Sequence, residues 1–322
     1  MISVQQVSKH YGTNRAVNNI SFEVAEHENL VLLGTSGCGK TTTLKMINRL
    51  IEPTRGQILI AGQDVTRQPA ELLRRNIGYV LQNNGLFPHY TVAENIAIVP
   101  RLLKWDDARI QNRMHELLEK LHLSAAFLKL YPQQLSGGQQ QRVGLARALM
   151  ADAPVLLMDE PFGALDTITR SKIQAEFKDL DELQRKTIVM VTHDVQEAFE
   201  LGNRICLMDQ GAIMQIGTPA ELLFKPANKF VREFLQAQRL QLELKAVLLQ
   251  QVWDNLPTTT STEAIKVLPA DTSIWAAMES FEAGVVKFIT VTKPGTDQAK
   301  TITFDQLMAA YHQYQNNLQH HE

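Results

Sequence analysis

Residues 34–42 read Gly34-Thr35-Ser36-Gly37-Cys38-Gly39-Lys40-Thr41-Thr42 and contain the pattern G-x-x-x-x-G-K-[ST] of a phosphate-binding loop. The apolar run 29–33 before it predicts a short buried strand, and residues 42–50 after it predict a helix. A loop in this position directs backbone N–H groups and the positive end of the helix dipole toward an anion. The pattern assigns Lys40 to the β- and γ-phosphates and Thr41 to Mg²⁺. A chance glycine-rich turn is the alternative, but such a turn does not require the flanking strand and helix.

Composition limits the class of protein. The chain has 322 residues, a formal net charge of −2 and 44% hydrophobic residues, which predicts a sizeable core and two domains, or one large and one small domain. The near-neutral charge argues against nucleic acid as a partner, because proteins that bind it through a broad basic face carry an excess of Lys and Arg. Two cysteines, Cys38 and Cys206, do not make a disulfide framework and fit a reducing cytosol.

The sequence also bears on the relation to membranes. No stretch approaches the roughly 18 apolar residues of a membrane span. The N-terminus alternates like a strand and lacks the layout of a signal peptide. We therefore expect a protein that is soluble, or that is held at a membrane by a partner.

The order of predicted elements indicates an α/β fold. The continuous apolar runs 154–158 and 187–191 are typical of parallel strands covered on both faces, and helical stretches separate them. Within 100–123 the apolar residues recur at helical spacing instead. We expect a helical subdomain at about 84–150 inserted into an α/β core.

Composition changes after residue 235. Residues 236–251 are rich in Gln and Leu and predict a linking helix, and the polar segment 257–262 is a candidate boundary. Beyond it, 273–281 is helix-like and 288–292 is strand-like. The expected domains are the α/β core with its helical subdomain (1–235), a linker helix and breaker (236–262), and a small α+β module (263–316).

Two carboxylates follow the predicted strand 155–158. Such a strand emerges beside the phosphate loop in folds of this kind, so Asp159 can contact Mg²⁺ directly or through water. Glu160 can polarise an attacking water as a general base. A strand end followed by a solvated acidic turn is the alternative, and the phosphate loop upstream disfavours it.

The segment 135–142 predicts the start of another helix. Ser136 and Gln139 fit a capping box, so a well-capped helix is the simpler account. Gly137 and Gly138 are more than a cap requires and leave the helix N-terminus bare, which makes an anion site beside a hydroxyl. One chain then has two phosphate-binding surfaces and one phosphate loop. We infer that the second surface serves a nucleotide on another copy of the chain.

These motifs together resemble the ATP-binding subunits of ABC transporters over about the first 235 residues, and 135–139 resembles the family signature. The resemblance implies a P-loop NTPase core and head-to-tail pairing of two domains, with ATP held between the phosphate loop of one and the signature of the other. Gln82 resembles the glutamine that senses Mg²⁺ and links the nucleotide to the membrane partner, and His193 resembles the switch histidine that contacts the γ-phosphate. Tyr11 resembles the aromatic residue that stacks on adenine; packing at a turn is the alternative. Asp166 ends a segment, 163–166, similar to the dimer-interface loop, where the family more often has Ser at position 163.

The resemblance therefore implies a site in four groups. The residues expected to act in hydrolysis are Glu160, His193, Lys40 and Gln82. The residues expected to hold Mg²⁺ are Thr41, Gln82 and Asp159. The residues expected at the interface between copies are Ser136, Gly138 and Asp166. The residues expected to bind ATP are Tyr11, Gly34, Thr35, Ser36, Gly37, Cys38, Gly39, Lys40, Thr41, Thr42, Ser136, Gly137, Gly138 and Gln139.

The resemblance also implies partners. A separate membrane permease is expected because the chain shows no span. Two copies of this chain are expected to form a homodimer that binds the permease at the cytoplasmic face of the membrane. An external solute-binding protein is expected to act through the same permease. Segments 45–50, 84–89 and 92–97 are similar to subunits for glycine betaine, choline or carnitine uptake. An importer for another small solute, an amino acid or an anion, is the alternative, because none of these residues touches the solute.

The C-terminal module leaves two roles open. Members of that transporter group often end in paired CBS regulatory modules, whereas residues 263–316 resemble at most one divergent copy, with 270–278 as its helix and 301–307 as its return. Ionic-strength sensing is one role. Packing between copies, or stabilisation of the chain, is the other.

Overall fold

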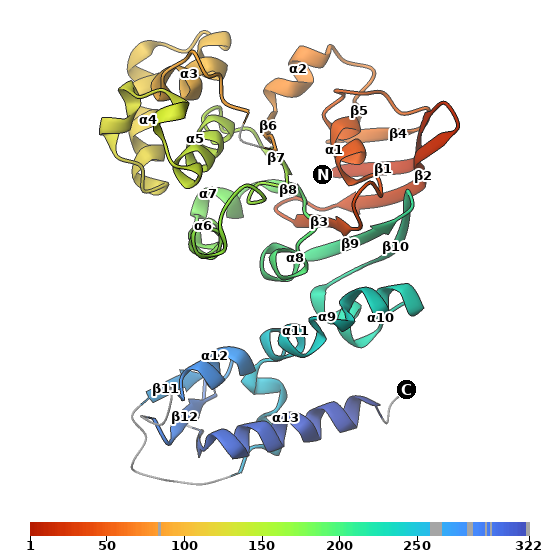
Figure 1. The fold of residues 1–322 in the computed structure, drawn as a ribbon, viewed down its shortest axis with the longest axis vertical. Coiled ribbons are helices and arrows are strands. Elements are labelled where there is room, and N and C mark those ends of the chain that lie inside the picture. The colour runs from red at the N-terminus through yellow and green to blue at the C-terminus, as the bar shows by residue number, and fades with distance from the viewer. Residues whose placement is uncertain (83–84, 258–265, 282–285, 294, 297, 320–322) are drawn as a thin grey trace. The chain divides into compact units, whose positions relative to one another are not determined.

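A computed structural model describes residues 1–82, 85–257, 266–281, 286–293, 295–296 and 298–319. The chain divides into two compact units, Met1–Thr218 and Pro219–Glu322 (Figure 1). Each unit has a hydrophobic core built from its own residues. The limit expected at residue 235 falls inside the second unit. Residue 84, most of the expected boundary 257–262 and the start of the expected module at 263–265 lie outside the described residues.

The first unit is built on a six-stranded sheet with the order β10-β9-β3-β8-β7-β6. Its strands are β3 (Asn29–Gly34), β6 (Ile77–Val80), β7 (Val155–Asp159), β8 (Thr187–Val191), β9 (Arg204–Asp209) and β10 (Ala212–Gly217). All neighbours are parallel except β10 and β9. β7 and β8 are buried at every position, in agreement with their continuous apolar sequences. Because parallel strands end at the same edge, the loops after β3, β6, β7 and β8 meet there.

A second sheet of the first unit is antiparallel and has the order β2-β1-β4-β5. Its strands are β1 (Ile2–Tyr11), β2 (Asn14–Val24), β4 (Arg55–Ile60) and β5 (Gln63–Asp64). Side chains from both sheets and from α1 (Lys40–Ile47) form one apolar cluster, which includes Val4, Leu32 and Leu44. The helix that follows the phosphate loop is therefore fixed between the two sheets.

Further helices complete the first unit: α2 (Ala70–Arg75), α3 (Val92–Leu102), α4 (Asp107–Lys120), α5 (Gly137–Leu149), α6 (Thr167–Asp179), α7 (Asp181–Gln184), α8 (Val195–Leu201), and the 3₁₀ turns η1 (Ala125–Lys129) and η2 (Pro132–Gln134). Helices α3, α4 and α5 pack on one another, and α5 contacts β6 (Figure 1). They fall within the segment of about 84–150 in which a helical subdomain is expected. The apolar residues of 100–123 fall on two helices, because Leu102 ends α3 and Asp106 caps α4.

The second unit begins with the helices α9 (Pro219–Phe224), α10 (Lys229–Gln236) and α11 (Arg239–Ala246), followed by the 3₁₀ turns η3 (Leu249–Gln251) and η4 (Trp253–Asn255). A three-stranded sheet, β11-β12-β13, then forms from β11 (Lys266–Pro269), β12 (Ile289–Thr292) and β13 (Ala299–Ile302), together with the helix α12 (Ile274–Glu279). The chain continues into α13 (Phe304–Gln319), where the sequence suggested only a return segment at 301–307. The unit is thus a small α+β module preceded by helices.

Within the described residues, no helix is both long enough and apolar enough to cross a membrane.

Candidate active site

The phosphate loop lies between β3 and α1 and requires glycine at two positions. Gly34 and Gly39 have φ angles of 151° and 104°, which residues with a side chain rarely adopt. A Cβ on Gly34 would collide with the carbonyl oxygen of Met208, and one on Gly39 with the carbonyl oxygen of Ala16. The loop therefore passes against the backbones of β9 and β2, which leave no room for another residue.

Lys40 is the first residue of α1, and its side chain folds back over the loop. Its Nζ donates hydrogen bonds to the carbonyl oxygens of Gly34 (2.9 Å) and Thr35 (2.8 Å) and lies 3.7 Å from Sγ of Cys38. The residue is 5% exposed. A positive charge is therefore held inside the loop, next to the free backbone N–H groups of the first turn of α1.

The loop lines a hollow of about 240 Å³. The loop residues that line it are Ser36, Gly37, Gly39, Lys40, Thr41 and Thr42. Glu160, which follows β7, lines the same hollow. The anion-binding loop and the carboxylate expected to act as a base therefore face one space.

Thr41 and Asp159 join the first turn of α1 to the end of β7. Thr41 Oγ1 donates a hydrogen bond to Asp159 Oδ1 at 2.8 Å. Asp159 is 3% exposed, and this burial raises its pKa, whereas the hydrogen bond from Thr41 acts in the opposite direction. A hydroxyl and a carboxylate oxygen placed side by side are ligands that Mg²⁺ prefers, so these residues fit the ion.

Glu160 is held between two polar side chains from the neighbouring strand ends. Gln82, after β6, donates a hydrogen bond from Nε2 to Glu160 Oε2 at 3.1 Å. His193, after β8, has Nδ1 3.1 Å from Glu160 Oε1. Three residues that the sequence separates by up to about a hundred positions therefore converge at the carboxyl edge of the sheet.

The backbone of Glu160 is also unusual. Its φ is 46°, in the left-handed region that residues other than glycine seldom occupy. Its N–H donates a hydrogen bond to the carbonyl oxygen of Val191 at 2.9 Å, which fixes it to the end of β8. Backbone strain of this kind persists where the surroundings enforce it and is common at functional sites.

The segment expected to form a second anion site starts α5. Ser136 and Gln139 form the predicted capping box: Ser136 Oγ accepts a hydrogen bond from the Gln139 N–H, and Gln139 Oε1 accepts one from the Ser136 N–H. Gly137 is exposed, as expected, but Gly138 is buried because the side chains of Thr169 and Ile173 on α6 cover it. In the described part of the chain, Ser136–Gln139 do not line the hollow at the phosphate loop.

Two further expected residues lie at the surface. Tyr11, at the end of β1, is 51% exposed, and Lys9 Nζ lies 5.2 Å from the centre of its ring. Asp166 caps α6 by accepting a hydrogen bond from the Thr169 N–H at 3.0 Å, and hydrogen bonding from Thr169 lowers the Asp166 pKa. Both side chains are accessible to a partner or ligand.

One contact of the loop was missed by the sequence analysis. Thr35 Oγ1 donates a hydrogen bond to Asp209 Oδ1 at 2.8 Å, which fastens the loop to the end of β9. The signal was present, because Asp209 follows the apolar run 205–208 just as Asp159 follows its own strand. A carboxylate at the end of any strand beside the phosphate loop is therefore a candidate contact.

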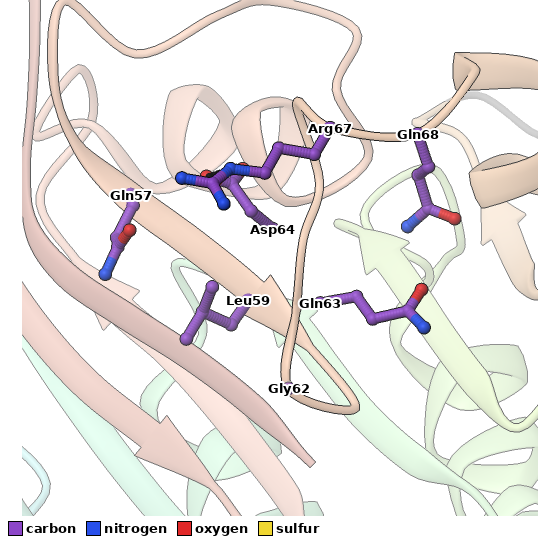
Figure 2. Close-up of a pocket in the computed structure, with 7 residues that line it drawn as sticks. All are labelled: Gln57, Leu59, Gly62, Gln63, Asp64, Arg67 and Gln68. Carbon is purple, nitrogen blue, oxygen red and sulfur yellow. Dashed lines mark ion pairs between the residues drawn. The ribbon is translucent and has the colours of Figure 1, made fainter.

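A second hollow, of about 350 Å³, lies at the β4–β5 hairpin and is unrelated to the phosphate loop. Figure 2 shows the residues that line it, Gln57, Leu59, Gly62, Gln63, Asp64, Arg67 and Gln68. Its two charged residues pair with each other, with Arg67 Nε 3.9 Å from Asp64 Oδ2. Within the described chain, the phosphate loop and Glu160 line the first hollow and not this one.

The chain is similar to known proteins in both sequence and fold. The family model described as "ABC transporter" matches residues 17–163, which include the phosphate loop, the segment 135–139 and the end of β7. A solved structure, "Dimeric structure of a post-hydrolysis state of the ATP-binding cassette MJ0796 bound to ADP and Pi", has a TM-score of 0.61 and 34% sequence identity, and the match covers 68% of this chain and 98% of that one.

Two curated proteins illustrate the similarity in sequence. The "Glycine betaine/carnitine/choline transport ATP-binding protein OpuCA" of Bacillus subtilis is 50% identical over 265 residues, which cover 82% of this chain and 70% of that protein. The "Osmoprotectant import ATP-binding protein OsmV" of Salmonella typhimurium is 51% identical over 267 residues, which cover 81% of this chain and 70% of that protein.

Proposed function

This chain belongs to the family of ABC transporter ATP-binding proteins, and we propose that it hydrolyses ATP to drive the uptake of a quaternary amine such as glycine betaine, choline or carnitine. The observation that carries the proposal is the hollow that the phosphate loop and Glu160 share. In it, the carboxylate of Glu160 is oriented by hydrogen-bond partners on both sides, Gln82 and His193.

The triphosphate binds at the phosphate loop. Lys40 and the N–H groups of the first turn of α1 neutralise its charge, and Tyr11 at the end of β1 stacks on the adenine. Thr41, Asp159 and Gln82 hold Mg²⁺, which when bound neutralises negative charge on the phosphate oxygens. The buried carboxyl group of Asp159 suits this role, because a cation beside it offsets the cost of burying its charge.

Hydrolysis uses the groups at the strand ends. Glu160 accepts the proton of a water molecule that attacks the γ-phosphate in line. Gln82 and His193 hold the Glu160 carboxylate in place. In this proposal, the imidazole of His193 also contacts the γ-phosphate of bound ATP. Lys40 remains on the phosphates through the reaction and stabilises the charge that develops on them.

A second copy of the chain completes the site. Ser136, Gly137, Gly138 and Gln139 of one copy contact the nucleotide of the other, and Ser136, Gly138 and Asp166 lie at the interface. Gly138 contributes through its backbone, because side chains of α6 cover its other side. The separation of the 136–139 segment from the hollow within one chain supports this assignment. The dimer docks on a membrane permease at its cytoplasmic face, and an external binding protein delivers the solute to that permease.

The solute is inferred from relatives. Proteins that are about half identical to this chain over most of its length are named for glycine betaine, carnitine, choline or osmoprotectant transport. Quaternary amines are therefore favoured over the alternative, an amino acid or an anion.

Uptake by the reconstituted transporter tests the function. We expect proteoliposomes containing the permease, its binding protein and this chain to accumulate radiolabelled glycine betaine when ATP is supplied on the side of this chain. Glu160→Gln should lower ATP turnover and uptake by roughly 100-fold or more while ATP binding is retained, because the amide keeps the shape of the base and cannot accept the proton.

Glu26→Gln is the matched control, because Glu26 is exposed and outside the hollow. It should leave uptake at the parental rate. Near-parental turnover by Glu160→Gln would remove Glu160 from its catalytic role. ATP-dependent uptake of sulfate or an amino acid in place of quaternary amines would reject the proposed solute.

A further inference from the structure

Arg170, on α6, connects two loops at the edge of the active site. Its Nη1 pairs with Asp194 Oδ2 at 3.2 Å, and its Nη2 donates a hydrogen bond to the carbonyl oxygen of Leu165 at 3.1 Å. Leu165 immediately precedes Asp166, and Asp194 immediately follows His193. The planar guanidinium group can bind a carboxylate and a carbonyl at once, so one side chain ties both loops together.

The backbone on either side of His193 is also anchored. Thr192 Oγ1 accepts a hydrogen bond from the Asp194 N–H at 3.0 Å and donates one to Glu197 Oε2 at 2.7 Å. Asp194 Oδ1 accepts hydrogen bonds from the N–H groups of Gln196 (2.9 Å) and Glu197 (3.2 Å) at the start of α8. Asp194 therefore has both of its carboxylate oxygens committed, one to α8 and one to Arg170.

His193 lies between these anchored residues in the chain and contacts Glu160. Its side chain is 57% exposed, so packing alone does not fix the imidazole. Nδ1 of His193 lies 3.1 Å from Glu160 Oε1, and this contact closes a ring of interactions. The chain itself joins Glu160 to Leu165 and His193 to Asp194, and Arg170 links Leu165 to Asp194 through its two contacts. A shift of the 161–166 loop therefore reaches His193 by a second route besides Glu160.

We propose that Arg170 is a positioning residue, which through Asp194 sets His193 against Glu160 and couples the position of the 161–166 loop to that of His193. The inference rests on the proposed function, in which Asp166 meets the second copy and His193 and Glu160 act on ATP. Docking of the second copy against this loop is then transmitted to the histidine, so that hydrolysis and assembly are linked within each copy.

A purely structural ion pair makes a different prediction. Arg170 and Asp194 are each 28% exposed, and ion pairs at such sites contribute little to stability. A small displacement of a catalytic group, by contrast, lowers turnover strongly, because the reaction requires close alignment. Turnover and stability should therefore respond very differently to the loss of Arg170.

A double-mutant cycle on the full chain tests the proposal. We expect Arg170→Met to lower kcat for ATP roughly tenfold or more, with the ATP dissociation constant changed by less than about twofold. His193→Ala should be more impaired still. In the His193→Ala background, Arg170→Met should lower kcat by less than about twofold further, because its effect acts through the imidazole.

Arg204→Met is the matched control. Arg204 likewise pairs with one carboxylate, Glu28 at 3.0 Å, and one carbonyl oxygen, that of Glu23 at 3.3 Å, on β9 and away from the hollow. It should leave kcat at the parental value. If Arg170→Met proves too unstable to purify, Asp194→Asn replaces it, because the amide oxygen still caps α8 while the charge that faces Arg170 is lost.

The outcomes separate the two proposals. Equal losses from Arg170→Met in the parental and His193→Ala backgrounds, or an equal loss from Arg204→Met, would overturn the positioning role and leave the proposed function intact. A parental kcat for His193→Ala would instead overturn the catalytic assignment of His193, and the role of Arg170 with it.

Discussion

Among single residues, Glu197 is a carboxyl group buried close to the active site. It is 4% exposed, and its Oε1 has no hydrogen-bond partner within the described chain. Burial raises the pKa of Glu197 from 4.5 to about 7. The hydrogen bond from Thr192 acts against that rise, Asp194 and Glu160 add to it, and Arg170 opposes it. The folded protein therefore holds a proton here that the unfolded chain releases at lower pH.

This proton predicts how stability depends on pH. Between pH 4.5 and about 7 the folded state binds more protons at Glu197 than the unfolded state, so its contribution to stability falls as the pH rises through that range. We expect Glu197→Gln to increase the free energy of unfolding by about 3 kcal/mol at pH 8 and by less than about 1 kcal/mol at pH 5. Amide hydrogen exchange in β8 measures this for the first unit. A gain that is the same at both pH values would show that the proton is not its cause.

The site residues that the sequence predicts are those inside contiguous motifs. Four of them have a fixed place in a loop or after a strand: Lys40, Thr41, Asp159 and Glu160. Lys40, Thr41 and Glu160 line one hollow, and Asp159 accepts a hydrogen bond from Thr41. The link made by Arg170 was not predicted, because it joins side chains and carbonyl groups from separate segments. Residue types alone do not specify such pairings.

Among the helices, α5 packs on α6 at Gly138, whereas the adjacent Gly137 is more open. A Cβ on Gly138 would lie 2.9 Å from Thr169 Cγ2 and 3.2 Å from Ile173 Cδ1, whereas the nearest atom to a Cβ on Gly137 is 3.8 Å away. We expect Gly138→Ala to destabilise the first unit by about 1–3 kcal/mol, because the side chains of Thr169 and Ile173 on α6 must shift to make room. Thermal unfolding followed by circular dichroism measures the effect.

Gly137→Ala provides the matched comparison, because it adds the same methyl group one position earlier in the same helical turn. It should leave the unfolding temperature unchanged or slightly raised, since alanine favours helix over glycine. Equal destabilisation by both substitutions would mean that helix geometry, rather than contact with α6, requires the glycines.

The sequence predicts helices and strands well where the hydrophobic period is regular. β7 and β8 match their apolar runs because both of their faces are covered. α13 was not expected at 304–319, although Thr303 and Gln306 form a capping box that marks its start: Gln306 Oε1 accepts a hydrogen bond from the Thr303 N–H at 2.9 Å. The capping box was missed because it directly follows the strand-like residues 301–302: β13 ends at Ile302 and α13 begins at Phe304.

At the scale of the whole molecule, each of the two units has an apolar core cluster among its described residues, and the cluster of the second unit spans residue 256. Residues before this point, such as Leu244 and Val252, pack with later ones, such as Ile289 and Tyr311. Glu243 also depends on the later part, because it accepts hydrogen bonds from Tyr311 Oη (3.0 Å) and Gln315 Nε2 (2.6 Å). A deletion that begins at residue 256 therefore divides a core rather than removing a domain.

Two truncations should consequently behave differently. A chain that ends at residue 255 keeps the apolar side chains of α11 and η3 without their partners, so we expect it to bind a hydrophobic dye and to self-associate in sedimentation experiments. A chain that ends at Thr218 keeps every residue of the first unit's core cluster and should remain monodisperse and bind ATP with parental affinity. Dye binding and aggregation by the shorter chain alone would contradict the division into two units. The cut at Thr218 removes the second unit without dividing either core cluster, so it is the deletion that can decide whether that unit regulates transport. A change in the salt dependence of uptake in that variant would reflect a lost regulatory role. The same change after a cut at residue 255 would reflect misfolding.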